Sequence, residues 1–317
     1  MNTAETIAVE QQLEIPTYDK MPMALVRGEG PYVWDAEGTR YLDFYGGHCV
    51  SLLGHCHPNV VEAVQAQAEK LIFYSNVAHS PVRARAAQHL ADLAPDGLGN
   101  VFFANSGSEA NETALKLARK YTGRSGVVAL EDGWHGRTLG SLATTHDEHY
   151  RAPYTDVLPE TTWVPVGDLD AAEQVLASEE IAAVILEPIQ SIAGMQEVPA
   201  DYVQGLRALC DAYGTLLVFD EVQTGVGRTG TFSMSEHLGA TPDLIALAKS
   251  LGAGVPVSGV LVDDAVAETV ETGDQGSTFG GGMLAMAAVA ATLDTLVEDD
   301  LMARATEIHA RCRRDRL

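Results

Sequence analysis

The sequence predicts an α/β fold in which a mainly parallel sheet of about seven strands is covered by helices on both faces. From residue 100 onward, short apolar runs alternate with segments whose apolar residues recur at helical spacing. Parallel strands require such alternation, because the chain must return to the same end of the sheet before each new strand. The 30 glycines against 13 prolines also suit many tight turns between strands and helices.

The N-terminal residues are expected to be less regular. Residues 1–30 are polar and irregular, which predicts an arm. Alternating apolar and polar residues within 32–44 predict two strands joined by a hairpin turn. Helices are predicted over residues 58–70, where Pro58 stands at the first position, and over residues 80–93.

The strands predicted for the main sheet are short apolar runs with turn signals at their ends. They are residues 101–104, 127–130, 162–164, 181–186, 216–220, 244–248 and 257–262. Helices are predicted over residues 109–121 and 202–213, and a long helical stretch is predicted from Met283 to Leu317. No glycine, proline or capping signal closes that last stretch, so we expect a chain shorter than its relatives.

The charge balance limits the classes of partner. The formal net charge is −24, and an acidic surface repels phosphate backbones, so nucleic-acid binding is not expected. No apolar run is long enough for a membrane helix and the acidic N-terminus lacks a signal pattern, so we expect no membrane contact and a cytoplasmic protein. The 44 acidic residues and few lysines also fit adaptation to high salt, although ordinary acidic proteins occur. That hypothesis predicts unfolding or lost activity on dialysis to low salt.

Cysteines and histidines gather in one short stretch, where Cys49 and Cys56 lie beside His48, His55 and His57. A metal site is one interpretation of this stretch. The cysteines do not form paired metal spacings, however, so a tight turn is the favoured interpretation and no metal is predicted.

A carboxylate closes the predicted strand at residues 216–220, and a glycine-rich loop follows it. Asp220 can cap that loop or the next helix, or it can bind a ligand, because ligands of α/β folds bind at the carboxyl ends of strands. A buried carboxylate needs a cationic or hydrogen-bonding partner, so the choice depends on what else the fold brings to that edge.

The stretch 105–110 separates a predicted strand from a predicted helix. Ser106, Gly107 and Ser108 would expose backbone N–H groups at the helix N-terminus, where these donors and the helix dipole favour an anion such as phosphate. Ordinary serine capping is the alternative. The stretch lacks the Gly-Lys-Ser/Thr and G-x-G-x-x-G patterns, so it is neither a Walker loop nor a dinucleotide fingerprint.

Lys249 follows the strand predicted at 244–248 and precedes a glycine-rich loop. A lysine at the mouth of a buried sheet should have a lowered pKa, which favours a nucleophilic amine or a Schiff base. A solvated lysine after a strand is the alternative. Asp220, Lys249 and the serine–glycine stretch together match the needs of pyridoxal phosphate (PLP): a carboxylate for the pyridine nitrogen, an amine for the aldehyde and a cradle for the phosphate.

The chain resembles the class III aminotransferases of PLP fold type I, and within them the acetylornithine and ornithine aminotransferase group. The resemblance runs from about Tyr18 to the C-terminus and rests on residues 220–225, Lys249 and residues 277–281. It implies three parts: an N-terminal arm with a small-domain segment (1–60), a large PLP-binding domain (61–283) and the start of a shortened C-terminal small domain (284–317).

The resemblance also implies roles for individual residues. Lys249 would bond to the cofactor aldehyde and move the substrate proton, and Asp220 would pair with the pyridine nitrogen. The other residues implied to bind the cofactor are Ser106, Gly107, Ser108, Trp134, Glu187, Val222, Gln223 and Thr278. Thr278 would reach the cofactor of the neighbouring subunit, so the resemblance implies a homodimer with shared active sites.

Arg137 determines the implied substrate class. A planar guanidinium binds a carboxylate through two hydrogen bonds, and the resemblance places Arg137 where it would hold the substrate carboxylate while the distal amine meets the cofactor. A surface arginine after a turn is the alternative. Ser277 and Tyr18 are also implied to lie near the substrate.

The expected activity is the transfer of an ω-amino group from N-acetylornithine, or a similar donor, to 2-oxoglutarate by a ping-pong mechanism. Ile192 stands where many relatives carry a glutamate, and His48 stands where ornithine-specific relatives carry a tyrosine. The alternatives are an ornithine or 4-aminobutyrate aminotransferase, and a truncated, non-catalytic remnant that binds PLP or dimerises. The remnant is considered because relatives bind the acceptor carboxylate through an arginine near the end of a longer chain.

Overall fold

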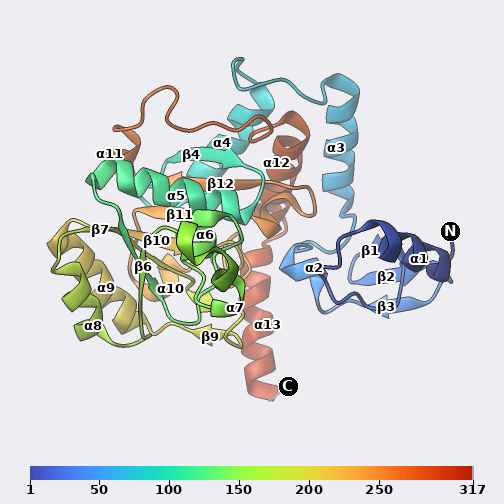
Figure 1. Cartoon of the computed structure of the whole chain (residues 1–317). Coiled ribbons are helices and arrows are strands. Elements are labelled where there is room, and N and C mark those ends of the chain that lie inside the picture. Colours follow the sequence, from blue (N-terminus) through green and yellow to red (C-terminus); the bar gives the residue numbers. More distant parts are fainter. Residues whose placement is uncertain (316–317) are drawn as a thin grey trace.

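The computed structural model describes residues 1–315, and its main sheet has seven strands in the order β4-β12-β11-β10-β7-β5-β6 (Figure 1). The strands are β4 (Asn100–Ala104), β5 (Gly126–Leu130), β6 (Thr161–Val164), β7 (Ile181–Leu186), β10 (Leu216–Asp220), β11 (Leu244–Leu247) and β12 (Ser258–Val262). The predicted fold class is therefore confirmed, and each of the predicted runs forms a strand of this sheet.

One strand of the main sheet is reversed. The β12 strand pairs antiparallel with both β4 and β11, whereas the remaining neighbours pair parallel. The short connection from β11 to β12 holds only the 3₁₀ helix η2 (Lys249–Gly252). Such a connection returns the chain beside the strand it has just left, because a parallel neighbour would need a full crossover. The turn places Lys249 near the carboxyl end of β11.

Helices cover both faces of the sheet, and the central strand β10 contributes to a core on each face. Leu217 and Phe219 belong to one apolar cluster, and Leu216 and Val218 belong to the other. The first cluster includes residues of α4 (Pro81–Leu93), α8 (Leu169–Leu176), α9 (Ala200–Tyr213) and α12 (Met283–Glu298). The second includes residues of α5 (Gly107–Thr122) and α11 (Asp264–Ala267). Burial on both faces explains why β10 is a continuous apolar run.

The N-terminal lobe is more regular than the sequence predicts, and the expectation of an irregular arm over residues 1–30 is wrong. The lobe contains helix α1 (Thr3–Leu13) and strand β1 (Leu25–Glu29). No residue of α1 is buried, so the helix lacks the apolar periodicity by which a sequence reveals one. The β1 strand pairs with β2 (Tyr32–Asp35), and β2 pairs with β3 (Arg40–Leu42) as the predicted hairpin.

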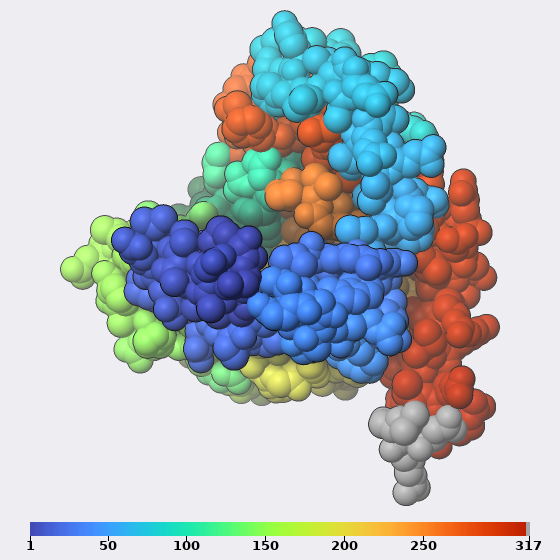
Figure 2. Space-filling model, turned by 90° about the vertical axis from the view of Figure 1, so that its right-hand side faces the viewer, coloured from blue at the N-terminus to red at the C-terminus, as the bar shows by residue number. Residues whose placement is uncertain are grey.

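Figure 2 views the molecule from the side of this lobe, which lies in blue in front of the main body. The red C-terminal helix lies along one side of the lobe in that view.

The predicted helix over residues 58–70 is present as α3 (Pro58–Lys70), and it packs against α12.

The long helical stretch predicted from Met283 is in fact two helices, so that prediction is wrong in its continuity. They are α12 and α13 (Leu301–Asp315), separated by Asp299 and Asp300. Asp300 has a φ of 51°, a left-handed conformation that cannot continue a right-handed helix. Residues 316 and 317, to which the predicted helix extended, lie outside the described residues.

Short elements complete the chain. They are α2 (Gly46–Cys49), α6 (Leu139–Ala143), α7 (Glu148–Arg151), the 3₁₀ helix η1 (Ala152–Val157), β8 (Ile189–Gln190), β9 (Gln196–Glu197) and α10 (Ser235–Leu238). Over residues 1–315, no helix has both the length and the apolar character needed to cross a membrane.

The stretch of cysteines and histidines around α2 forms a local ion pair. The Nε2 atom of His55 lies 2.7 Å from Oδ2 of Asp43. Across the described part of the chain, no three His, Cys, Asp or Glu side chains are grouped as a metal site would require.

Candidate active site

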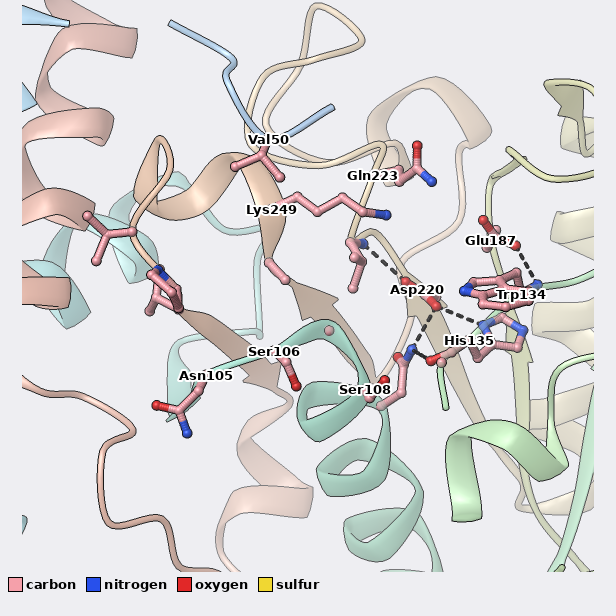
Figure 3. Close-up of a pocket in the computed structure, with 18 of the residues that line it drawn as sticks. Val50, Asn105, Ser106, Ser108, Trp134, His135, Glu187, Asp220, Gln223 and Lys249 are labelled. Atoms are coloured by element: carbon pink, nitrogen blue, oxygen red, sulfur yellow. Dashed lines mark hydrogen bonds and ion pairs between the residues drawn. The ribbon is translucent and has the colours of Figure 1, made fainter. Parts of the chain in front are cut away.

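The carboxyl ends of the parallel strands open into a cavity of about 370 Å³, within the size range of small-molecule sites (Figure 3). Five turns form much of its wall, and they follow β4, β5, β7, β10 and β11. The predicted cofactor residues that line the cavity are Ser106, Gly107, Ser108, Trp134, Glu187, Asp220, Val222, Gln223 and Lys249. The fold thus gathers side chains from distant parts of the sequence around one space.

The first turn of α5 provides an N–H cradle. Ser106 is the N-cap, and its Oγ accepts a hydrogen bond from the N–H of Glu109 at 3.3 Å. Capping and anion binding are compatible here, because the first N–H groups of a helix have no partner within the helix. A Cβ at Gly107 would lie 2.9 Å from Cγ1 of Val222, so a larger residue would push into the cavity wall. The absence of a side chain therefore lets the helix start approach Val222 closely.

Asp220 lies at the end of β10 and is only 4% exposed. Its Oδ2 accepts a hydrogen bond from Nδ2 of Asn111 at 2.7 Å and lies 2.7 Å from Nδ1 of His135. Its Oδ1 accepts the backbone N–H of Val222 at 3.1 Å. A carboxylate only accepts hydrogen bonds, so His135 carries its proton on Nδ1 in this contact. Three donors compensate the buried charge.

Asn111 and His135 line the cavity and contact Asp220, and the sequence analysis missed both of them. The side-chain amide of Asn111 also donates to the backbone carbonyl of His135 at 2.7 Å, which joins α5 to the loop after β5. Asn111 Oδ1 and His135 Nε2 are both buried without a hydrogen-bond partner. The spacing of Gly107 and Asn111 was an available signal, since residues four apart share one face of a helix.

Lys249 extends into the cavity near Asp220 and Gln223 (Figure 3). Its φ is 40°, a left-handed conformation uncommon outside glycine and frequent at functional sites. Burial lowers the pKa of the Lys249 amine, and the nearby Asp220 and Glu187 carboxylates act in the opposite direction without cancelling that effect. The lowered pKa favours the neutral amine, which is the nucleophilic form.

Glu187 is the second buried carboxylate of the cavity. Burial, together with the charge of Asp220, raises the pKa of Glu187 to about 7. Its Oε1 accepts the backbone N–H of Trp134 at 2.8 Å, which fixes the loop that carries the Trp134 ring. Glu187 can therefore hold or release a proton near neutral pH, beside Asp220 and the Lys249 amine.

Two further contacts connect outlying segments to the cavity. Nε2 of Gln223 donates to Oγ of Ser191 at 2.6 Å, which ties the β8–β9 hairpin to the turn after β10. The guanidinium of Arg228 donates to the carbonyl of Cys49 at 2.7 Å and to Oγ of Ser250 at 3.0 Å. The two hydrogen bonds of Arg228 hold α2 against the turn that carries Lys249.

The structure does not place the remaining predicted residues in the cavity wall. Arg137 follows the lining residue Gly136, and its backbone N–H donates to Oγ of Ser108 at 3.2 Å. Ser277 Oγ accepts from Nδ2 of Asn105, a lining residue, at 3.2 Å, which places Ser277 at the rim. Thr278 is exposed beside it. Tyr18 is 80% exposed and lines a separate surface pocket beside α1.

Comparison with known proteins identifies the family. The sequence profile of the class-III aminotransferases matches residues 15–315. The chain belongs to the class-III aminotransferases. This aminotransferase is 49% identical over 285 residues to the acetylornithine aminotransferase of Methanopyrus kandleri. The matched region covers 90% of this chain and 73% of the relative.

Solved structures agree with the fold. The ornithine aminotransferase of Toxoplasma gondii superposes with a TM-score of 0.92 at 31% identity, covering 98% of this aminotransferase and 75% of that chain. The taurine:2-oxoglutarate aminotransferase of Bifidobacterium kashiwanohense, solved in complex with PLP and glutamate, gives a TM-score of 0.93 at 28% identity. That match covers 99% of this aminotransferase and 77% of the other chain.

The family and its PLP-containing neighbour imply PLP as the cofactor, and the residues of the cavity fit it. Because Gly107 has no Cβ to press into Val222, the start of α5 lies close against the cavity wall, with its N–H groups placed as a phosphate cradle requires. Lys249 is a half-buried amine whose pKa is lowered by desolvation, which favours the neutral form that bonds to an aldehyde. Asp220 is a buried carboxylate at the strand end, suited to a protonated ring nitrogen.

Proposed function

We propose that the protein transfers an ω-amino group from N-acetylornithine to 2-oxoglutarate, with PLP as its cofactor. The observation that carries the proposal is a single cavity lined by the half-buried amine of Lys249, the buried carboxylate of Asp220 and the helix start at Ser106–Ser108. The donor is proposed from the acetylornithine aminotransferases, two of which are 49% and 44% identical to this chain.

The proposed cofactor contacts follow from the cavity. The N–H groups of Gly107 and Ser108 would hold the phosphate, Asp220 would hold the ring nitrogen, and Gln223 would lie near the phenolic oxygen. Trp134 and Val222, which both line the cavity, would hold the ring through their apolar surfaces. When bound, PLP supplies an aldehyde that bonds to amines and a ring that accepts the electron pair released when a substrate C–H bond breaks.

The protein side chains move and hold protons in this proposal. The neutral amine of Lys249 would accept the proton that leaves the substrate carbon and hold it at Nζ until it is given up again. Asp220 remains an acceptor throughout, because Asn111, His135 and the backbone of Val222 stabilise its charge. These donors are fixed in the folded chain, so little reorganisation is needed when charge develops on the ring.

The homodimer is supported by an exposed apolar surface near Thr278. We call it the 71–77 surface, and its members are Leu71, Ile72, Phe73, Tyr74, Val77 and Phe279, each between 37% and 87% exposed. The rings of Phe73 and Phe279 lie 5.2 Å apart, so the surface continues onto the loop that carries Thr278. Clustered apolar side chains of this kind favour a protein partner, and we propose a second copy of the chain.

A mixing experiment tests the shared site. Lys249→Ala and Thr278→Ala should each lower glutamate formation on their own. Their mixed dimer should recover activity, because one of its two sites then has both native residues. If mixing at equal concentrations gives only the sum of the two residual activities, the shared site is wrong.

A donor panel tests the reaction itself. The PLP-loaded protein is assayed for glutamate formation from 2-oxoglutarate with N-acetylornithine, ornithine or 4-aminobutyrate. We expect the highest kcat/KM with N-acetylornithine. Ornithine is the second candidate, because the ornithine aminotransferase of T. gondii shares the fold at a TM-score of 0.92. Visible absorbance of bound PLP that Lys249→Ala abolishes, with no glutamate from any donor, would instead identify a non-catalytic remnant.

A further inference from the structure

Arg137 is exposed, and its guanidinium lies against two aromatic rings. Its guanidinium carbon lies 3.9 Å from the ring centroid of Tyr150 and 5.3 Å from that of Trp134. The two rings meet edge to face, with centroids 5.0 Å apart and an interplanar angle of 88°. Among the residues that the structure describes, Arg137 forms no ion pair, although the chain carries 44 acidic residues.

Contact with aromatic faces holds a guanidinium in place without neutralising it. The attraction comes from the ring quadrupole, so no carboxylate is used and the N–H groups remain able to bind one. The cation is therefore ordered before a ligand arrives, which reduces the entropy lost on binding. Arg137 is held at a second point, because its backbone N–H donates to Ser108 at the cradle.

The position of Tyr150 is fixed from the edge of the main sheet. Tyr150 lies in α7, and the next residue, Arg151, anchors that helix. The Arg151 guanidinium lies 4.1 Å from the ring centroid of Trp163 on β6, and it donates to the carbonyl of His146 at 2.8 Å. The contact of Arg151 with β6 therefore holds α7 in place, and the Tyr150 ring on α7 in turn holds the Arg137 guanidinium.

Trp134 connects the same aromatic group to the cavity. It lines the cavity, and its backbone N–H is bound by Glu187. The Tyr150 ring, the Trp134 ring and the Arg137 guanidinium therefore form one group, which we call the 134–137–150 clamp. One part of the clamp lies in the cofactor cavity, and its charged part lies beside that cavity.

We propose that Tyr150 is a specificity-determining residue that holds the Arg137 guanidinium against Trp134, so that substrates carrying a carboxylate away from the reacting amine are preferred over plain amines. This inference rests on the proposed ω-aminotransferase function and deepens it, because it names the side chain that positions the carboxylate-binding cation. Tyr150 acts through Arg137 and is a positioning residue.

The test uses the PLP-loaded protein and a ligand that cannot react. N-acetylnorvaline carries the carboxylate and acetyl group of N-acetylornithine but no distal amine, and N-acetylnorvalinamide lacks the charge. Calorimetry should show that Tyr150→Leu raises the Kd of N-acetylnorvaline by about three- to thirtyfold, the range of a lost cation–π contact. Tyr150→Phe keeps the ring and should bind as the native protein does. Tyr154→Leu, which removes an exposed tyrosine one turn further on, is the matched control.

Kinetics provide the second readout. With N-acetylornithine, Tyr150→Leu should raise KM by the same factor and leave kcat within about twofold, because uniform binding is lost and no transition-state contact is removed. Urea midpoints of the variants show whether the substitution has instead disturbed the fold.

Several results would overturn the inference. They are an unchanged Kd in Tyr150→Leu, equal weakening in Tyr150→Phe, equal weakening for the amide, and a native protein that does not prefer the carboxylate. The two proposals fail separately. Tyr150-dependent carboxylate binding without glutamate formation contradicts the aminotransferase proposal alone, whereas turnover that Tyr150→Leu leaves unchanged contradicts the clamp alone.

Discussion

Replacement of Asp220 by asparagine separates the structural role of this side chain from its proposed catalytic role. In the native protein Oδ2 contacts two donors at 2.7 Å, from Asn111 and His135, and Oδ1 accepts a third from Val222 at 3.1 Å. An asparagine amide has only one acceptor oxygen. If that oxygen takes the Oδ2 position, the NH₂ group faces the N–H of Val222, and one buried donor loses its partner.

The structural cost of Asp220→Asn follows from this geometry. One unsatisfied buried donor costs about 1–3 kcal/mol of unfolding free energy. The catalytic cost should be larger, because an amide cannot keep the cofactor ring nitrogen protonated. Removal of one preorganised electrostatic partner of a developing charge typically costs about 100- to 1,000-fold in kcat, and we expect at least the lower value.

The assay pairs urea unfolding of the PLP-free protein with glutamate formation at saturating PLP and donor. Asp243→Asn is the matched control. Asp243 is also surrounded by donors, since its Oδ2 accepts from the backbone of Leu217 at 2.6 Å and from Arg207 at 2.7 Å, but it lies outside the cavity. A kcat for Asp220→Asn within about threefold of that for Asp243→Asn would refute the reasoning, because a purely structural carboxylate predicts that result.

Three further substitutions test residues in and next to the cavity. At Gly136, where φ is 134°, a Cβ would clash with Oγ of Ser108. Gly136→Ala should therefore lower the unfolding free energy by about 2–4 kcal/mol and weaken PLP binding, measured by urea and absorbance titrations. Gly99→Ala, whose Cβ would have its nearest neighbour at 3.9 Å, should change neither quantity, and equal effects would contradict the steric argument. Lys249→Met should raise the urea midpoint of the PLP-free protein at pH 7 while abolishing activity. Burial lowers the Lys249 pKa from 10.5, so stability is lost as the pH falls below that value and remains lost at neutral pH; a lower midpoint would contradict this. For Glu221, burial raises the pKa from 4.5 to about 7. Between those values the folded protein keeps a proton that the unfolded chain releases, so stability falls as the pH rises. Glu221→Gln should reduce the loss of unfolding free energy between pH 5 and pH 8 by about 3 kcal/mol, and an unchanged pH profile would show that the carboxyl does not titrate in this window.

Much of the main sheet could be predicted because its signals are local. Each strand is a short apolar run bounded by turn residues, and burial on both faces makes β7 and β10 continuous. The cradle, Asp220 and Lys249 could also be predicted, because each lies at or just after the end of a strand, and residues at the carboxyl ends of parallel strands meet at one edge.

The incorrect predictions have physical causes. The α1 helix buries no residue, so its sequence shows no apolar stripe. The break between α12 and α13 depends on the left-handed conformation of Asp300. Two consecutive aspartates do not by themselves predict that break, because aspartate is tolerated within helices at a modest cost.

The sequence by itself therefore determined the fold class, the residues after the strands and, through the family resemblance, the cofactor class. The tertiary structure decided which side chains surround these predicted site residues. Asn111, His135, Tyr150 and Ser191 come from α5, the loop after β5, α7 and the β8–β9 hairpin, and they meet Asp220, Arg137 and Gln223 only in the folded chain. The physical reason is the order of the strands: β10 lies between β7 and β11, and β5 lies on the far side of β7, so the neighbours of each strand end depend on long-range pairing.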